Sequence, residues 1–302
     1  MKRRRVLWLA ILVIIAAAAI AVVLDPDRRV QGWLAGEPFY QGRAASAWRR
    51  DLRQPESPRS ADAFTALVAG KRDAVPVCAW VLRAAPEPEA RWRAADVLGR
   101  MGKDALSAAP ELVAALADHD ALVRSVAVRA IGELAPDVPG GVQALIPLFP
   151  DVEAMRAVAR FGPVGAEAVP ALVAALKQDD PTARWQAARA LGKIGAPSVP
   201  AVPELARLTI SDPDPLVREH AAEALGDIGS PATDGIPALV QALRDPVARV
   251  RRDAVRALGQ MGPTAKCVLA EIRALGQDSD ADVRDAALRA VRLIVPSENP
   301  KK

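Results

Sequence analysis

The sequence is poor in aromatic residues and in cysteine. Aromatic side chains make up 4% of its 302 residues, and Tyr40 is the single tyrosine. The core must therefore consist of aliphatic side chains and alanine. We expect Cys78 and Cys267 to be buried free thiols about six hairpins apart, roughly 50 Å at the usual helix spacing, whereas a disulfide needs Cα atoms within about 7 Å. Cysteine usage thus indicates no particular redox compartment.

The common motifs of catalytic and metal sites are also missing. The chain has no Cys-x-x-Cys, no His-Glu-x-x-His and no Gly-x-Ser-x-Gly, and its Gly-Lys pairs lack the upstream glycine of a phosphate loop. The two histidines, His119 and His220, are expected roughly 30 Å apart, too far to share a metal ion. Each is interpreted as a solvated surface residue. We predict a protein that is not an enzyme, with no cofactor and no metal.

The chain also lacks a basic body. Four of its 40 lysines and arginines lie at residues 2–5, which leaves 36 basic residues against 36 acidic ones. The pI near 9.3 therefore reflects the N-terminus. A protein that binds nucleic acid through bulk charge needs a positive surface, so this balance argues against that function.

What the chain does have is one phrase that returns four times. It spans Arg91–Gly102, Arg184–Gly195, Arg218–Gly229 and Arg251–Gly262, and the last three closing glycines stand 34 and 33 residues apart. A fixed period in this range is the mark of a stacked repeat array. We therefore predict an all-α fold, a right-handed α-solenoid of about seven to eight helical hairpins, with no strand.

Each phrase predicts a helix with one buried face, which we call the B helix. Counted from the first arginine as position 0, apolar residues recur at −1, +3, +4, +6, +7 and +10, while +1, +2, +5 and +9 fall on the opposite side. The two glycines are expected to end this helix. Eight residues later a proline usually opens the other helix of the next hairpin, the A helix, as proline is tolerated in a first turn. These prolines are Pro110, Pro170, Pro203 and Pro237.

One junction departs from the period. Ala135 stands where a closing glycine belongs, and Gly162 follows after only 27 residues. Pro147 lies inside the expected A helix, which it should kink or break. Asp151 replaces the usual arginine at position 0. We expect this junction to misalign two halves of the superhelix.

The N-terminus carries a candidate membrane anchor. Residues 1–5 are a basic flank, and residues 6–24 contain 19 residues without a charge, which as a helix would span about 28 Å of a hydrocarbon core of roughly 30 Å. The charge asymmetry favours a cytoplasmic N-terminus in the inner membrane and an extracytoplasmic body. The alternatives are a cleaved signal peptide, with Ala19-Ile20-Ala21 as its site, which would give a secreted or periplasmic protein, and a buried core helix.

Three further segments complete the domain prediction. Residues 25–58 are a linker and N-terminal cap with a turn at Gln41-Gly42, a short helix near residues 44–53, and Tyr40 and Trp48 covering the open end of the stack. The alternative for these two aromatic residues is a ligand site. Residues 59–295 form the repeats, and residues 296–302 are expected to be a disordered tail.

The repeat resembles a known family. Val217-Arg218 followed by Ala221-x-x-Ala224-Leu225-Gly226 is similar to the HEAT repeat, and more closely to the bacterial PBS-lyase HEAT-like repeats. The resemblance covers about residues 60–295, and Tyr40-Gln-Gly-Arg43 with Trp48 is similar to the start of membrane-anchored bacterial HEAT proteins. It implies an interaction scaffold in which an aspartate of each turn and the arginine of each B helix form ladders between units. The matching pairs are Asp118/Arg124, Asp212/Arg218, Asp245/Arg251 and Asp278/Arg284.

The same resemblance implies that B helices line the concave face, so positions +5 and +9 should point into a groove. These positions are mostly basic although the body is neutral, and a concave groove focuses such a field. We therefore predict a membrane-tethered scaffold that binds a protein with an acidic segment. The alternatives are a lyase-like enzyme of the PBS type and a nucleic-acid-binding module, for which Trp92 and Trp185 are the only hint. The predicted contact residues are Arg129, Arg156, Arg160, Trp185, Arg189, Lys193, Arg256 and Arg289.

Overall fold

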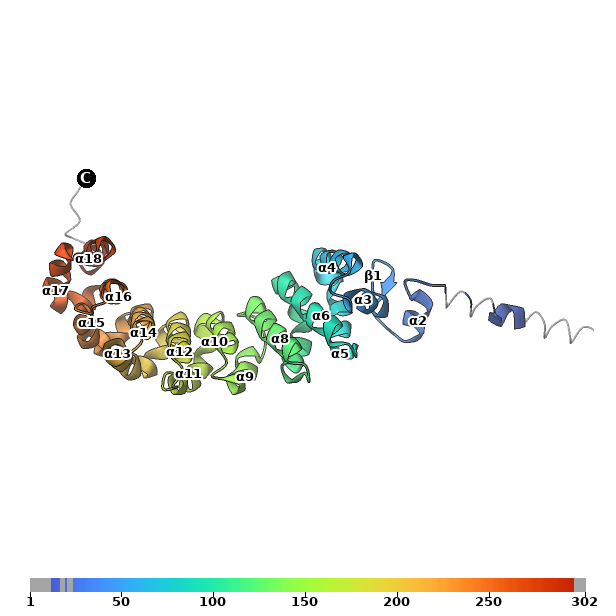
Figure 1. The fold of residues 1–302 in the computed structure, drawn as a ribbon, viewed down its shortest axis with the longest axis horizontal. Helices are drawn as coiled ribbons and strands as arrows, with labels where there is room; N and C mark the ends of the chain where they lie inside the picture. The colour runs from blue at the N-terminus through green and yellow to red at the C-terminus, as the bar shows by residue number, and fades with distance from the viewer. Residues whose placement is uncertain (1–11, 17–19, 21–23, 296–302) are drawn as a thin grey trace, which may run out of the picture. The chain divides into compact units, whose positions relative to one another are not determined.

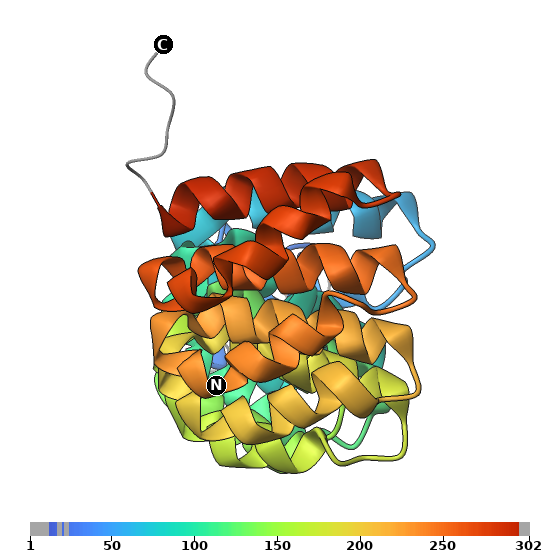
Figure 2. The same ribbon diagram turned by 90° about the vertical axis from the view of Figure 1, so that its left-hand side faces the viewer.

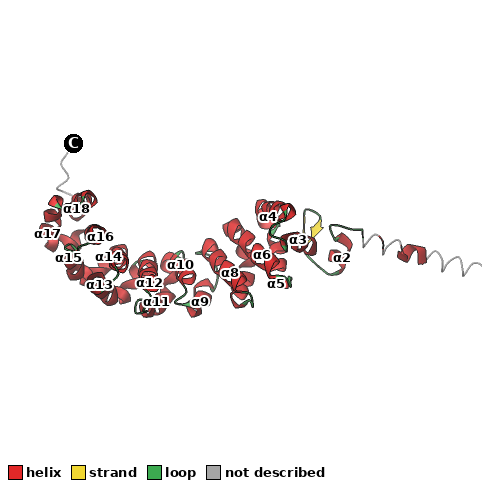
Figure 3. Cartoon of the chain, in the orientation of Figure 1, coloured by secondary structure: helices red, strands yellow, loops and turns green. Residues whose placement is uncertain are grey.

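The computed structural model describes residues 12–16, 20 and 24–295, which are almost entirely helical (Figures 1 and 3). The chain divides into two compact units, residues 1–134 and 135–302, and the boundary lies at the irregular junction. The described elements of the N-terminal unit are α2 (Arg29–Leu34), β1 (Phe39–Tyr40), β2 (Arg43–Ala44), α3 (Ala45–Leu52), α4 (Pro58–Gly70), α5 (Val75–Ala84), α6 (Pro88–Met101), α7 (Ala109–Ala114) and α8 (Ala121–Leu134).

The C-terminal unit continues the alternation of A and B helices. Between residues 75 and 294 the helices α5 to α18 pair in order into seven hairpins, in line with the predicted number. The elements of this unit are α9 (Gly141–Leu145), α10 (Val152–Ala159), α11 (Val169–Ala175), α12 (Pro181–Ile194), α13 (Val202–Ser211), α14 (Pro215–Ile228), α15 (Ile236–Ala242), α16 (Ala248–Gln260), α17 (Leu269–Ala274) and α18 (Ala281–Ile294).

The apolar register of the B helix is confirmed. In α14 the predicted core positions are all buried, and Leu225 at +7 is fully enclosed. The opposite side is less exposed than predicted, because positions +1 and +2 pack toward the neighbouring hairpins. Gln186, Glu219 and Asp253 are all buried polar residues at these two positions.

The two glycines of each phrase have separate roles, so the prediction that both end the helix was wrong for the first. Gly226 lies inside α14, and a Cβ there would stand 2.6 Å from Cα of Ala257 in α16. It is glycine because the next B helix passes at backbone contact. Gly229, at φ 80° and ψ −148°, ends the helix, and this conformation is accessible essentially to glycine alone.

Proline opens the A helices as predicted. Pro110, Pro170, Pro203 and Pro237 each lie in the first turn of α7, α11, α13 and α15. A short 3-10 turn fills the stretch between the closing glycine and each of these helices. The missing N–H of proline costs nothing there, because first-turn amides have no helical acceptor.

An arginine–aspartate ladder joins successive hairpins, as the resemblance implies, and each arginine bonds the aspartate of the following hairpin with two nitrogens. Arg218 Nε and Nη2 bond both oxygens of Asp245 in the next hairpin at 2.7 and 3.1 Å, while its Nη1 donates to the carbonyl of Asp212 in its own turn. Equivalent bidentate pairs are Arg91–Asp118, Arg184–Asp212 and Arg251–Asp278. Each pair thereby fixes the distance between adjacent turns.

The irregular junction shortens its hairpin. Pro147 lies in a 3-10 turn directly after the five-residue α9, so the predicted break is confirmed. Asp151 caps the eight-residue α10 by accepting from the amide of Ala154, and the preceding helical turn is absent. The ladder is therefore interrupted here, and its acceptor position in the next hairpin is Gln178 instead of aspartate. The predicted misalignment across this junction stays a prediction.

The N-terminal cap is a packed element with one feature that the sequence did not predict. Trp48 is buried, with Tyr40 at 5.6 Å between ring centroids and the Arg43 guanidinium 4.2 Å from its ring. The turn at Gln41-Gly42 joins a two-residue antiparallel ladder, β1 and β2, so the expectation of no strand was wrong at this point. Both turn residues have positive φ, which suits a tight hairpin.

Other terminal predictions fall largely outside the described residues. The structure covers only residues 12–16, 20 and 24 of the anchor segment, and among the described residues no helix has the length and apolar character to cross a membrane. The basic flank at 1–5 and the tail at 296–302 are not described. Cys78 is buried as predicted, but Cys267 is exposed, because it lies on the outer side of a turn rather than in a helix core.

Candidate functional site

The B helices of the C-terminal unit lie along the inner side of the arc that this unit makes, and its A helices lie outside (Figure 1). Positions +5 and +9 of each B helix are separated by about one helical turn, so both point away from the core. In α10 and α12 these positions are occupied by Arg156, Arg160, Arg189 and Lys193, and all four are exposed.

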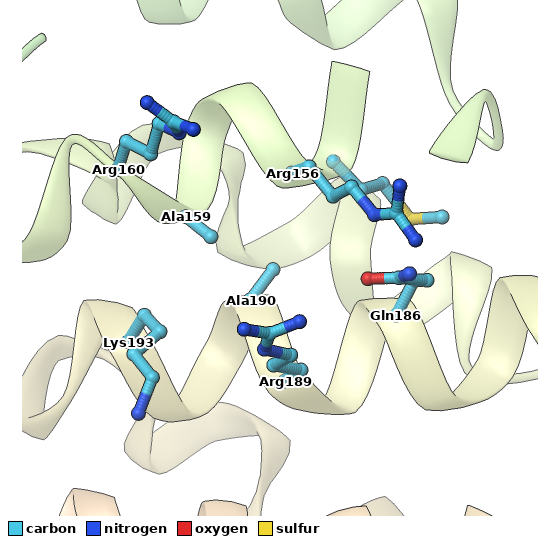
Figure 4. A pocket seen from close by; sticks show the side chains of 8 residues that line it. Arg156, Ala159, Arg160, Gln186, Arg189, Ala190 and Lys193 are labelled. Atoms are coloured by element: carbon cyan, nitrogen blue, oxygen red, sulfur yellow. The ribbon is translucent and has the colours of Figure 1, made fainter. Parts of the chain in front are cut away.

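These four cations line one groove between α10 and α12, of about 440 Å³. Figure 4 shows Arg156 and Arg160 reaching in from α10, and Arg189 and Lys193 from α12. The remaining lining residues are Met155, Ala159, Gln186 and Ala190. The lining thus contains four basic side chains and no acid.

The four cations differ in their partners. Arg156 Nη1 bonds Glu153 at 2.7 Å, and Lys193 Nζ bonds Asp227 of α14 at 2.9 Å. Arg189, by contrast, makes no hydrogen bond or ion pair with any residue that the structure describes. Its guanidinium is therefore the group in the groove whose donors are most available to an outside acceptor.

A buried glutamine, Gln186, holds Arg156 in place. Gln186 is 2% exposed, and with its amide oxygen turned toward α10 it accepts from Arg156 Nε at 2.9 Å and Nη2 at 2.8 Å. This contact bridges α10 and α12 where the ladder is missing. The helical periodicity predicts Gln186 on the solvated side, so this role was missed from the sequence. The signal that could have indicated it is that position +2 is polar in three successive B helices, where it is Gln186, His220 and Asp253.

The other predicted contact residues lie elsewhere. Arg129 is in the N-terminal unit and pairs with Asp96 at 2.9 Å. Arg256 pairs with Asp253 at 3.0 Å, and Arg289 is exposed on α18. Trp185 does not line the groove, because its ring stacks on that of His220 at 5.0 Å between α12 and α14.

The two histidines lie in different surroundings. His119 is exposed, as predicted, whereas His220 is only half-buried, stacked on Trp185 and bonded through Nδ1 to Glu223 at 2.9 Å. This bond lowers the pKa of Glu223.

Burial raises the pKa of Cys78 to about 12, so this thiol is inert as a nucleophile. Within the described residues no group of histidine, cysteine or acidic side chains could hold a metal ion.

An equivalent groove lies between α6 and α8 in the N-terminal unit. Its volume is about 540 Å³, and the same repeat positions line it. Positions +5 and +9 are here Asp96 and Arg100 on α6, and Arg129 and Glu133 on α8. This groove carries two charges of each sign, and Asp96 bonds both arginines at 3.2 and 2.9 Å.

Comparison with known proteins agrees with this architecture. A family model described as HEAT repeats matches residues 75–159, 151–209 and 202–292. An engineered protein of solved structure is 23% identical, with a TM-score of 0.57 over 83% of this chain and 78% of that chain. A mutant of Kap121p is 14% identical, with a TM-score of 0.58 over 83% of this chain and 33% of that chain. A search of curated proteins gives no match. At these identities the solved structures show the fold alone.

Proposed function

Because this chain belongs to the HEAT-repeat family, we propose that it is a non-catalytic scaffold that binds other proteins. Its specific site is the basic groove between α10 and α12, and its ligand is an acidic protein segment. The observation that carries the proposal is a groove lined by four cations and no acid, with Arg189 unpaired among the described residues.

The spacing of the four cations suits several carboxylates at once. Positions four residues apart on a helix are separated by about 6 Å, and neighbouring helices lie about 8–10 Å apart. Like charges this close repel one another, and an acidic segment that binds between them relieves the repulsion. The low-dielectric walls of a groove strengthen this effect. Arginine adds geometric preference, because its planar fork matches a carboxylate.

A protein segment fits this groove better than a nucleic acid does. The inner face becomes acidic beyond α12, since positions +5 and +9 of α14 hold Glu223 and Asp227. A long polyanion would meet these acids as soon as it left the groove. The binding track is therefore short, which suits a few acidic residues of a peptide.

Membrane attachment is the second part of the proposal. The uncharged run at 6–24 and the basic flank before it support a single-pass inner-membrane anchor with the repeats on the extracytoplasmic side. Protease added to intact spheroplasts should then digest the repeats. Protection of the repeats together with a cytoplasmic control protein would show that the orientation is reversed.

The groove is tested with the full chain in detergent and a labelled peptide of ten glutamates. We expect binding that weakens steeply with salt and that falls by about tenfold or more, 1.4 kcal/mol, in the variant with Arg156→Glu and Arg189→Glu. The matched control carries Arg100→Glu and Arg129→Glu at the same repeat positions of α6 and α8, and its affinity should change less than about threefold, or 0.7 kcal/mol.

Two outcomes would contradict the proposal. One is equal binding by wild type and the Arg156/Arg189 variant at every salt concentration. The other is a single-stranded oligonucleotide of ten residues that binds more tightly than the peptide, which would favour the nucleic-acid module. Because Arg156 contacts Gln186, Arg189→Glu alone is measured as well, and thermal unfolding checks that each variant is folded.

A further inference from the structure

No residue that the structure describes covers one face of α18, the last B helix in the described part of the chain. In the preceding B helices position +4 packs onto the next hairpin, and Ala188, Ala222 and Val255 are completely buried there. The same position in α18 is Leu288, which is 55% exposed. Figure 2 looks onto this end of the C-terminal unit, with α17 and α18 nearest the viewer. A leucine thus stands where the repeat pattern places a core residue.

The same face carries half of a ladder pair. Arg284 Nη1 donates to the carbonyls of Asp278 and Ser279 at 2.7 and 3.0 Å, as Arg251 Nη1 does to Asp245 in the preceding hairpin. Arg251 also uses Nε and Nη2 to grip Asp278. The Nε and Nη2 of Arg284 bond no residue that the structure describes. This fork is therefore held in place without its carboxylate.

Another hairpin of the same kind does not fit onto this face. Position +8 is Gly226 in α14 and Gly259 in α16, where an added Cβ would stand 2.6 and 2.9 Å from Cα of the following B helix. In α18 the position is Arg292, which is exposed. Its side chain occupies the space that the close approach of a further B helix requires.

We propose that this face joins two copies of the chain, with the two α18 helices packed antiparallel about a two-fold axis. Arg284 and Asp285 are adjacent, and an axis between them places each arginine opposite the partner's Asp285. The charges then pair twice. In a parallel arrangement like charges would meet instead. Two-fold pairing of one self-complementary surface is the commonest way in which soluble proteins form dimers.

The rest of the face agrees with this register. Leu288 is then opposite the partner's Ala281, a small residue that leaves room for it, and this contact also occurs twice. Helical spacing puts Ala281, Asp285 and Leu288 on one side of α18. The partner's helix begins at Ala281, so Arg292 lies beyond its end. The side chain that blocks another hairpin therefore does not block a second α18.

The test is a charge exchange in the full chain, purified in detergent, with the protein mass measured by light scattering. Wild type should be a dimer. Asp285→Arg should weaken the dimer by about tenfold or more, equivalent to 1.4 kcal/mol, because two arginines then face each other. Arg284→Glu should do the same, and the variant with both exchanges should restore the dimer. Arg289→Glu, on the inner face of the same helix, is the control and should leave the mass unchanged.

A monomeric wild type at tens of micromolar overturns the proposal, and so does a dimer that survives Asp285→Arg. A double exchange that fails to restore the mass also overturns it, provided that circular dichroism shows all variants folded. Arg284→Glu removes bonds to the Asp278 and Ser279 carbonyls and can lower stability. Asp285→Arg changes only an exposed side chain, so it decides the question alone. Peptide binding in the α10–α12 groove is independent of this result.

Discussion

The two grooves, one in each unit, occupy the same repeat positions and differ in charge. Between α6 and α8, positions +5 and +9 hold Asp96, Arg100, Arg129 and Glu133, which sum to zero. Between α10 and α12 they hold Arg156, Arg160, Arg189 and Lys193, which sum to +4. The backbone scaffold is the same, so specificity in this fold resides in exposed positions that the core does not constrain.

A second difference concerns how the hairpins are joined. Arg91 and Asp118 form a bidentate ladder pair between the hairpins of α6 and α8, and both side chains are mostly buried. The hairpins of α10 and α12 have Asp151 and Gln178 at these positions, and the Arg156–Gln186 contact replaces the pair. The basic groove therefore lies where the ladder is interrupted. Arg156, which makes the contact that replaces the ladder pair, is also one of the four cations of the groove.

The largest effect should come from the core that both grooves share. Leu98 of α6 and Leu191 of α12 are fully buried at position +7. Leu98→Ala and Leu191→Ala should each lower the free energy of unfolding by about 2–5 kcal/mol, because a cavity remains. Urea denaturation followed by circular dichroism measures both. A loss below about 0.5 kcal/mol for either one would show that the two helices do not share a register.

The second largest effect on stability should come from the ladder pair Arg91–Asp118, and this effect depends on pH. Asp118→Asn should cost about 1.5–3 kcal/mol near neutral pH, the value of a hydrogen bond to a charged group. The bond from Arg91 lowers the pKa of Asp118 below its ordinary value of 3.8. Its stabilisation is therefore present above about pH 4 and is lost as the pH falls through the lowered pKa.

Unfolding free energies measured from pH 7 to pH 2 check this sign. The Asp118→Asn variant should lose less stability on acidification than wild type does. The matched control is Gln178→Asp, which restores the acceptor where no arginine precedes it, and it should change stability by less than about 0.5 kcal/mol. Equal acid sensitivity of wild type and Asp118→Asn would show that this pair does not stabilise the fold.

The sequence predicted the period, the core face and the proline starts because each depends on a pattern within one hairpin. It did not separate the roles of Gly226 and Gly229, since the first depends on how closely the following helix passes. Ladder partners lie 27 or 28 residues apart, and the resemblance implied a ladder between units but not which aspartate each arginine bonds. A pattern within one repeat therefore predicts the structure of a hairpin but not the contacts between hairpins.

The candidate site was also predicted only in part. Arg156, Arg160, Arg189 and Lys193 were predicted to share one stripe, and they line one groove. Trp185 was predicted beside them and is stacked on His220 instead, because position +1 faces the following B helix. Gln186 was missed because a buried amide at position +2 has meaning only when its partner in α10 is known. Whether the groove binds an acidic segment stays a prediction.

The smallest effect is the most specific test of the difference between the grooves. Arg129 and Arg189 both occupy position +5 on exposed helix surfaces, but Arg129 bonds Asp96, whereas the charged residues that line the groove with Arg189 are all basic. Arg129→Ala should therefore cost a few tenths of a kcal/mol, as expected for an exposed ion pair. Arg189→Ala should raise stability by a similar amount, because it removes repulsion. Salt screens both effects, so the two variants should converge on wild type at about 1 M salt. Thermal unfolding at low and high salt measures both signs, and a destabilising Arg189→Ala would mean that this side chain has an acidic partner in solution and that the groove is not poised for an anion.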